Sequence, residues 1–274
     1  MFSPDRPLTP FWHVKKAIWT AKGIARRRAL LRIATRGPYA DVRVPHTTMR
    51  VDLRDHSGFR LFRDGSYEVQ ETAVIRTLIP PGGVVLDIGA NLGYYTSLFA
   101  TIAGTVYAIE PTPNTLTLLR QNTRAYPNVT VLPIAVSDYE GFADLYLSTS
   151  NSGQNTLYGA GAAVHVPVTT VDVLCRHRRI TRVDLIKMDI EGAEIHALRG
   201  MQDTLRANPH ALLILEFCRA HLRRAGSTLT EWLDAIGPAS FSCITASGEA
   251  PIDRAWMEVQ LERHYQSVIV RRHS

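Results

Sequence analysis

Apolar positions along residues 84–236 follow two alternating patterns. Short continuous apolar runs, typical of strands buried on both faces of a parallel sheet, are separated by longer segments whose apolar positions recur at helical spacing. The predicted strands are residues 84–88, 105–110, 129–133, 183–188 and 211–217. The predicted helices are residues 92–102, 115–123, 171–178, 193–206 and 228–236. This alternation indicates an α/β fold with a mostly parallel, Rossmann-like sheet.

Two later segments complete the predicted sheet. Residues 241–246 and 265–271 have no segment of helical period between them, so we expect an antiparallel edge hairpin and seven strands in all. Residues 134–170 interrupt the alternation with a hairpin expected around residues 138–141 and a polar loop at residues 148–153. A long insert near the carboxyl ends of strands commonly recognises an acceptor.

The segment before residue 84 predicts a helix and a small β flank. The short strands expected in the flank are residues 42–44, 49–53 and 59–62. A helix is expected at residues 67–78, and its inward positions are Val69, Ala73, Val74 and Leu78. Residues 9–35 mix apolar and basic side chains and predict one or two amphipathic helices. We therefore expect a basic helical arm with a β flank at residues 1–66 and a catalytic domain at residues 67–274.

Composition is typical of a globular chain without a membrane span. With 274 residues, of which 45% are hydrophobic, it can bury a full core. Because no apolar stretch reaches about 18 residues and no secretory signal is evident, we expect a cytoplasmic protein. Cys175, Cys218 and Cys243 are odd in number and widely spaced, so we expect them to be reduced and structural.

The positive charge is concentrated at the N-terminus. Residues 1–36 carry nine Lys or Arg against one Asp, a net +8, which leaves −2 for the rest of a chain with net charge +6. The near-neutral remainder argues against a nucleic-acid partner. For the arm, three interpretations stay open: a docked or dimer-forming segment, a peripheral contact with anionic lipid, and a nucleic-acid contact. We expect a homo-oligomer, most simply a dimer.

The first predicted strand leads into a glycine turn that is typical of an S-adenosylmethionine site. Asp87, Gly89 and Gly93 follow the apolar run at the strand's carboxyl end, where a ligand approaches the backbone closely. A dinucleotide fingerprint would need glycines where Asn91 and Tyr94 stand. A donor without a phosphate therefore fits better, and Asp87 is suited to accept a bond from its amino group.

Two further acidic positions complete the predicted donor site. Glu110 ends the second strand, where a carboxylate can accept both ribose hydroxyls. Ser137 and Asp138 follow the third strand, where they would meet the adenine amino group unless Asp138 only forms a turn.

Charged side chains also gather after the fourth strand. Lys187, Asp189, Glu191 and Glu194 lie within eight residues of one another, and Glu216 ends the fifth strand. Carboxyl ends of strands face the ligand crevice in open α/β sheets, so we expect Asp189 and Glu191 to face it. Helix capping accounts for Glu194. A lone buried ammonium is costly, so Lys187 requires a partner.

The role of these carboxylates is left open between three kinds of chemistry. Asp189, Glu191 or Glu216 could be a general base or could orient an acceptor hydroxyl. Asp189 and Glu216 could instead hold a divalent ion such as Mg²⁺, and Glu216 could simply pair with Arg219. Histidines show no spacing typical of a zinc site.

With these residues in view, the chain resembles the FkbM family of S-adenosylmethionine-dependent methyltransferases. The resemblance covers about residues 67–270 and rests on five segments: residues 85–96, 108–111, 170–172, 187–194 and 215–216. Its cofactor motif adds Ala90, Asn91, Tyr94, Thr96 and Pro111 to the expected donor-binding residues. The resemblance implies a class I methyltransferase fold and methylation of a hydroxyl on a sugar, glycolipid or polyketide-type natural product.

The expected reaction is an in-line displacement in which an acceptor oxygen attacks the sulfonium methyl group. Lys187, Asp189, Glu191 and Glu216 are the candidate catalytic residues. The alternative function is RNA ribose 2′-O-methylation, which only the arginine-rich arm favours. A dehydrogenase and a non-enzymatic binding module are the remaining candidate functions.

Overall fold

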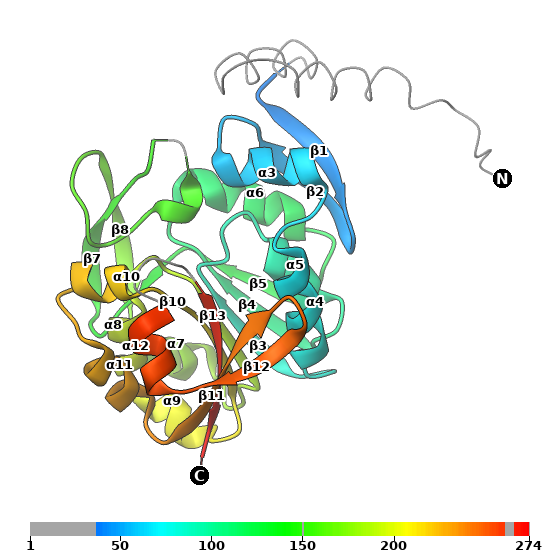
Figure 1. The fold of residues 1–274 in the computed structure, drawn as a ribbon. Coiled ribbons are helices and arrows are strands. Elements are labelled where there is room, and N and C mark those ends of the chain that lie inside the picture. The colour runs from blue at the N-terminus through cyan, green and yellow to red at the C-terminus, as the bar shows by residue number, and fades with distance from the viewer. Residues whose placement is uncertain (1–36, 150, 261–265, 274) are drawn as a thin grey trace. The chain divides into compact units, whose positions relative to one another are not determined.

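The computed structural model describes residues 37–149, 151–260 and 266–273 (Figure 1). These residues fall into two compact units, which divide between Ser66 and Tyr67. Each unit is described by itself. The predicted helical arm lies outside the described residues.

The unit that ends at Ser66 contains a hairpin and a helix. Strands β1 (Tyr39–Val44) and β2 (Thr47–Asp52) include most of the first two predicted strands, and they pair in antiparallel register. The third predicted strand, residues 59–62, is wrong, because this segment belongs to helix α3 (His56–Asp64). Asp55 begins the helix by accepting bonds from two backbone amides. The buried positions then follow helical rather than strand spacing.

The second unit contains an eight-stranded sheet in its described residues, in the order β12-β11-β13-β10-β9-β3-β4-β5. The strands are β3 (Val84–Ile88), β4 (Thr105–Ile109), β5 (Val129–Leu132), β9 (Leu185–Met188), β10 (Leu212–Phe217), β11 (Ala239–Thr245), β12 (Gly248–Ile252) and β13 (Gln266–Arg272). Strands β5, β4, β3, β9 and β10 are parallel, so their carboxyl ends share one edge. The predicted class I, Rossmann-like fold is confirmed.

The late strands differ in detail from the prediction. Strand β13 lies between β10 and β11 and is antiparallel to both, so the two predicted late strands do pair. The edge itself is a hairpin of β11 with the additional strand β12, which raises the count from seven to eight. Pro251 within β12 is acceptable there because an edge strand has one unpaired side.

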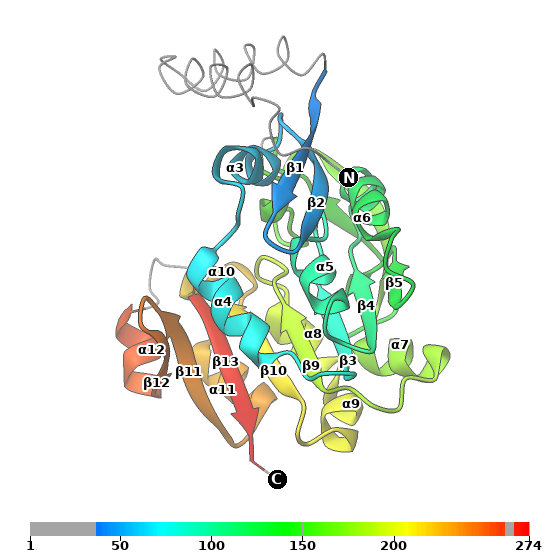
Figure 2. The ribbon, with the colours of Figure 1, turned by 90° about the vertical axis from the view of Figure 1, so that its right-hand side faces the viewer.

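Helices cover both faces of this sheet (Figures 1 and 2). They are α4 (Val69–Leu78), α5 (Tyr94–Ala100), α6 (Pro113–Thr123), α7 (Val171–Arg178), α8 (Glu194–Arg199), α9 (Gln202–Ala207), α10 (Arg219–Arg224), α11 (Leu229–Ile236) and α12 (Arg254–Gln260). The main core packs α8, α9 and α11 against the strand residues that share a face with Leu86 and Ile186. The opposite face carries Asp87 and Lys187, which are register partners on β3 and β9.

Two helix predictions need correction. The predicted helix at residues 193–206 is two helices, α8 and α9, separated at Gly200, where a Cβ would lie 2.1 Å from the carbonyl oxygen of Ser137. In α4, Ile75 is buried, whereas Val69 is 64% exposed. The inward face was misassigned because α4 turns Glu71 toward β13, where the carboxylate accepts a bond from Ser267.

The insert at residues 134–170 forms a separate three-stranded sheet. Strand β8 (Ala163–Thr169) pairs with β6 (Ala135–Val136) and with β7 (Gly141–Tyr146). The predicted turn at residues 138–141 does connect two strands, but these strands do not pair with each other. The polar loop, with the short helix η1 (Ser152–Gln154), instead connects β7 to β8.

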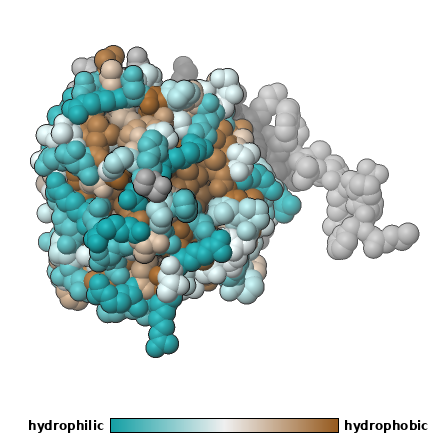
Figure 3. Space-filling model, turned by 90° about the horizontal axis from the view of Figure 1, so that it is seen from below, coloured by the Kyte–Doolittle hydropathy of each residue, from teal (hydrophilic) through white to brown (hydrophobic). Residues whose placement is uncertain are grey.

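One face of the molecule carries both apolar and polar side chains. The face seen in Figure 3 shows apolar side chains among more numerous polar ones. Among the described helices, none is long and apolar enough to cross a membrane. All three cysteines are buried and free.

Candidate active site

The turn after β3 is shaped by close packing against neighbouring elements. Gly89 has φ +84°, and a Cβ there would lie 1.9 Å from the carbonyl oxygen of Asp189. Gly93 has φ +92° and precedes α5, and a Cβ at this position would lie 2.8 Å from the Leu119 side chain. The two glycines are therefore required by the protein's own packing and by their left-handed backbone. Asn91, between them, also has a left-handed backbone with φ 49°.

Hydrogen bonds fasten this turn to β4. The amides of Gly89 and Ala90 both donate to the Ile109 carbonyl, at 2.9 and 3.0 Å. Glu110 accepts from the Asn91 amide at 3.0 Å through Oε2 and from the Thr112 amide at 2.8 Å through Oε1. Burial nevertheless raises the pKa of Glu110. Two carboxylate oxygens offer about four acceptor positions, so Glu110 has capacity for a ligand hydroxyl beside the bonds from Asn91 and Thr112.

Asp87 lies behind the turn, where it is 1% exposed. Its Oδ2 accepts from the buried Thr96 hydroxyl at 2.5 Å, whereas its Oδ1 has no hydrogen-bond partner among the described residues. Burial raises the pKa of Asp87, and the charge of Lys187 opposes this rise. This hydrogen bond joins β3 to α5, the two elements that the turn connects. Ala90 and Tyr94 are also buried, and Pro111 follows Glu110 directly.

Ser137 and Asp138 are engaged with protein partners. The Ser137 hydroxyl donates to Asp138 Oδ1 at 3.3 Å, and Asp138 Oδ2 lies 2.9 Å from His196 Nδ1. Although partial burial opposes ionisation, the hydrogen bond with His196 lowers the pKa of Asp138. Contact of Asp138 with an adenine amino group stays a prediction.

The polar loop of the insert contacts three of the loops at the carboxyl ends of the parallel strands. Ser152 donates to Asn91 Oδ1 at 3.3 Å, and Asn155 donates to the Thr112 hydroxyl at 3.2 Å. Thr156 donates to the Glu191 carbonyl at 2.9 Å. The insert is therefore joined to the turn after β3, to the loop after β4 and to the loop after β9.

Lys187 has the partner that its burial requires. Its Nζ lies 3.3 Å from Asp189 Oδ2 and 4.7 Å from the centre of the Tyr95 ring. Burial alone would lower the pKa of Lys187, but the charges of Asp189 and Asp87 raise it above its usual value. Asp189 keeps 39% of its side chain exposed, so this ion pair has one buried and one open end.

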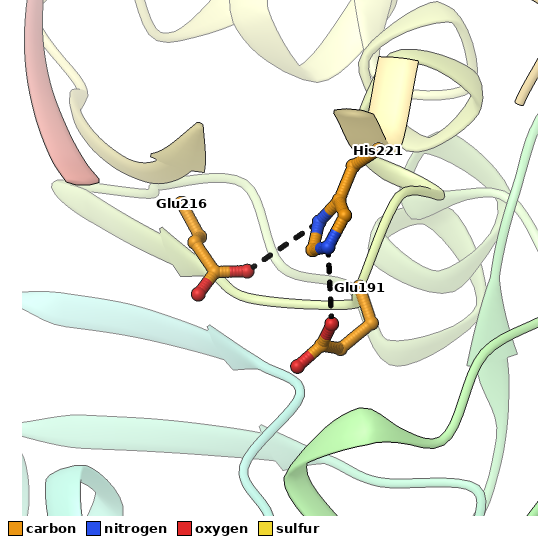
Figure 4. A group of neighbouring side chains, drawn as sticks. All are labelled: Glu191, Glu216 and His221. Atoms are coloured by element: carbon orange, nitrogen blue, oxygen red, sulfur yellow. Dashed lines mark ion pairs between the residues drawn. The ribbon is translucent and has the colours of Figure 1, made fainter. Parts of the chain in front are cut away.

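Glu191, Glu216 and His221 form the second charged group (Figure 4). His221 Nε2 lies 3.3 Å from Glu191 Oε2, and His221 Nδ1 lies 3.8 Å from Glu216 Oε2. Burial and the charge of Asp189 raise the pKa of Glu191 to about 8 and raise that of Glu216 well above its usual value. Burial and the charge of Arg224 lower the pKa of His221 to about 4. Burial thus disfavours the charged form of each member of this group.

The structure separates Glu194 from this group. Its two carboxylate oxygens accept from the amides of Ile190 and Gly192, at 3.0 and 2.9 Å. Burial raises the pKa of Glu194 to about 7. Glu194 lies in the first turn of α8, where a carboxylate complements the helix dipole, but its hydrogen bonds hold the preceding loop and do not cap the helix.

Sequence reasoning missed three residues near this edge. Glu68 accepts from the Tyr95 hydroxyl at 2.9 Å and has a left-handed backbone with φ 43°. Burial and the charge of Glu68 raise the pKa of Glu71 to about 7. His221 was missed because α10, on which it lies, was not predicted. The acidic pair at the start of the helix at residues 67–78 was the available signal for Glu68 and Glu71.

Comparison with known proteins identifies the family. The model of the methyltransferase FkbM domain matches residues 87–243, which include the turn after β3 and the charged groups after β9 and β10. The chain therefore belongs to the FkbM methyltransferase family.

Curated relatives are similar over about half of the chain. Hexuronic acid methyltransferase AglP of Haloferax volcanii is 28% identical over 142 residues, which are 50% of this chain and 59% of AglP. The 2-O-methyltransferase NoeI of Sinorhizobium fredii is 24% identical over 48% of this chain and 63% of NoeI. The 31-O-demethyl-FK506 methyltransferase FkbM of Streptomyces tacrolimicus is 26% identical over 45% of this chain and 61% of that protein. The chain thus spans less than two thirds of each of these relatives.

Among solved structures, the methyltransferase FkbM from Methylobacillus flagellatus is similar, with a TM-score of 0.47 and 15% sequence identity. The similarity covers 94% of this chain and 58% of that one.

Proposed function

We propose that this protein transfers a methyl group from S-adenosylmethionine to a hydroxyl of a sugar, glycolipid or polyketide-type natural product. The observation that carries the proposal is the meeting of two groups at one edge of the sheet. The glycine turn and Glu110 lie at the ends of β3 and β4, and Asp189, Glu191 and Glu216 lie at the ends of β9 and β10. The names of the relatives, which act on a hexuronic acid, at a 2-O position and on demethyl-FK506, support this acceptor class.

The donor is proposed to lie across the end of β3. Glu110 would accept the ribose hydroxyls, because its second lone pairs are not used by the backbone amides that hold it. Gly89, Ala90, Asn91, Gly93 and Tyr94 would form the floor of the site, with Asp87 and Thr96 as support. In the sheet order, β9 lies on the side of β3 opposite to β4. The sulfonium methyl group would therefore point toward Asp189.

Asp189 is the carboxylate best placed to receive the acceptor's proton. It remains partly exposed, while Lys187 fixes one of its oxygens from the buried side. In the proposed step the acceptor oxygen forms a bond to the methyl carbon, the carbon–sulfur bond breaks, and adenosylhomocysteine leaves as a neutral thioether. The hydroxyl proton passes to Asp189. Lys187 acts as a positioning residue for this carboxylate.

Calorimetry and methyl-transfer assays test the proposal. We expect adenosylhomocysteine to bind the protein and NAD not to bind, which separates a methyltransferase from a dehydrogenase. Labelled S-adenosylmethionine would then be offered with a uronic acid glycoside, a neutral glycoside, a macrolide alcohol and an oligoribonucleotide. Transfer to the oligoribonucleotide alone would favour the RNA alternative. Absence of adenosylhomocysteine binding by folded protein would overturn the proposal.

Asp189→Asn tests the proposed proton acceptor. We expect turnover to fall at least about 100-fold, because a general base commonly contributes that much, while adenosylhomocysteine affinity stays nearly unchanged. Asp234→Asn, on the exposed side of α11, is the matched control and should keep full turnover. Full activity of Asp189→Asn would transfer the role to another carboxylate, and Glu216→Gln is then the next variant to assay.

Location and assembly remain predictions from the sequence. We propose a cytoplasmic enzyme that forms a homodimer, with a peripheral membrane contact through residues 1–36 as the alternative role of the arm. Gel filtration and flotation with anionic vesicles, each with and without residues 1–36, would test both.

A further inference from the structure

Three side chains from three separate segments converge beside the proposed acceptor position. Glu191 lies in the loop after β9, Glu216 near the end of β10, and His221 on α10. Each offers one nitrogen or oxygen atom, and these atoms all lie within 4.8 Å of one another. Figure 4 shows the imidazole between the two carboxylates. We call this set the Glu–His–Glu group.

Within the described residues, the Glu–His–Glu group has fewer hydrogen bonds than its polar atoms could form. Glu216 Oε2 is sealed from solvent and has no hydrogen-bond partner among the described residues. Its distance of 3.8 Å from His221 Nδ1 is too long for a hydrogen bond. A neutral imidazole carries a single N–H, so His221 cannot donate to both carboxylates at once.

The neighbouring basic side chains are directed elsewhere. Arg224 Nη2 donates to the backbone carbonyl of Glu191 at 2.6 Å. Lys187 pairs with Asp189. The sequence predicted a metal site formed by Asp189 and Glu216. Because Asp189 pairs with Lys187, Glu216 instead lies with Glu191 and His221.

We propose that Glu191, Glu216 and His221 bind one divalent transition-metal ion, of the class of Mn²⁺, Fe²⁺, Co²⁺ or Zn²⁺. An imidazole with two carboxylates suits these ions, whereas Mg²⁺ prefers oxygen ligands alone. The meaning of the site rests on the proposed function, because an ion here would bind the acceptor oxygen and favour its ionised form while Asp189 receives the proton. The binding itself is independent of that function.

Metal titration of the full chain tests the proposal. After treatment with EDTA, calorimetry with MnCl₂, ZnCl₂ and MgCl₂ should show one equivalent of Mn²⁺ or Zn²⁺ bound at least about tenfold more tightly than Mg²⁺. Glu216→Gln and His221→Gln should each weaken Mn²⁺ binding at least about tenfold. Glu140→Gln and His177→Gln, at exposed positions, are matched controls and should bind as the wild type does. His221→Asp, which supplies a carboxylate oxygen in place of the imidazole nitrogen, should bind Mn²⁺ more tightly than His221→Gln does.

The outcomes separate this site from the proposed function. If the wild type binds adenosylhomocysteine but none of the three ions, the metal site is overturned and the methyltransferase proposal stands. Equal Mn²⁺ binding by the wild type, Glu216→Gln and His221→Gln would also overturn it. If one variant does not fold, as judged by circular dichroism, the others still decide the result. If the wild type binds Mn²⁺ but does not bind adenosylhomocysteine, the proposed function is overturned and the metal site stands.

Discussion

The parallel strands end at one edge of the sheet, and the two halves of this edge differ in their hydrogen bonding. We call them the β3–β4 half and the β9–β10 half. At the ends of β3 and β4, Glu110 accepts two backbone amides and the amides of Gly89 and Ala90 are bound by β4. At the ends of β9 and β10, Glu216 keeps a buried oxygen without a partner among the described residues, and Glu191 has a left-handed backbone with φ 56°. In the β3–β4 half, backbone amides therefore hold Glu110 without a ligand, although Asp87 Oδ1 behind the turn also lacks a partner among the described residues. In the β9–β10 half, the carboxylate without a partner, Glu216, belongs to the Glu–His–Glu group, where a proton or a cation would satisfy it.

This difference indicates where binding changes the protein least. A preformed β3–β4 half would receive the proposed donor without rearrangement, which favours precise placement of its methyl group. The buried carboxylates of the β9–β10 half cost stability in the absence of a ligand and regain it when positive charge arrives. The proposed donor, S-adenosylmethionine, is cationic and would bring such charge.

Gly89→Ala should have the largest effect, because Gly89 is the point at which the two halves touch. Its Cβ would lie 1.9 Å from the Asp189 carbonyl oxygen, and its φ of +84° is unfavourable for alanine. We expect the free energy of unfolding to fall by at least about 3 kcal/mol and adenosylhomocysteine binding to be lost. Urea denaturation and calorimetry measure these effects.

Two causes contribute to the expected loss of stability in Gly89→Ala: the clash of the Cβ with Asp189 and the strained backbone. Gly226→Ala measures the second cause alone. Gly226 has a similar φ of +70°, but a Cβ there would meet no atom within 4 Å. We expect Gly226→Ala to lower the free energy of unfolding by about 1 kcal/mol, which is typical of a strained backbone. Equal losses for the two variants would show that the contact between the halves contributes nothing.

Glu110→Gln should have the next largest effect and tests whether the β3–β4 half binds ribose. We expect adenosylhomocysteine affinity to fall about tenfold, because one charge-assisted hydrogen bond contributes roughly 1.5–3 kcal/mol. The 2′-deoxy analogue of adenosylhomocysteine sharpens the test. It should bind the wild type more weakly than adenosylhomocysteine does, yet bind Glu110→Gln about equally well. An undiminished preference for the 2′-hydroxyl in Glu110→Gln would leave Glu110 with a structural role only.

The sequence predicted the β3–β4 half more completely than the β9–β10 half. The strands at residues 84–88 and 105–110, the glycine turn and Glu110 are local signals, because each is written within one βα unit. His221 belongs to the site only through the packing of α10, a short helix with no clear period in the sequence. The pairing of Lys187 with Asp189, and that of Glu71 with Ser267, likewise depends on contacts that no local pattern specifies.

Glu71→Gln should have the smallest effect and tests the cost of carboxylates in the β9–β10 half. Glu71 accepts from Ser267, whose register partner on β10 is Glu216, and its pKa is raised from 4.5 to about 7 by burial and by Glu68. The folded state therefore binds this proton more tightly than the unfolded state does. The resulting stability is fully present below pH 4.5 and is lost as the pH rises to about 7.

Glutamine keeps the oxygen that accepts from Ser267 but cannot ionise, so Glu71→Gln should lose this pH dependence. Relative to the wild type, its melting temperature should be higher by a few degrees at pH 8, at roughly 2–4 °C for each kcal/mol in a domain of this size. At pH 4.5 the two proteins should melt within about a degree of each other. The charges of Lys187 and Asp189 act on the pKa of this carboxyl in opposite directions. Glu140→Gln, which removes an exposed carboxylate, is the control, and a melting difference that is the same at both pH values would contradict the raised pKa of Glu71.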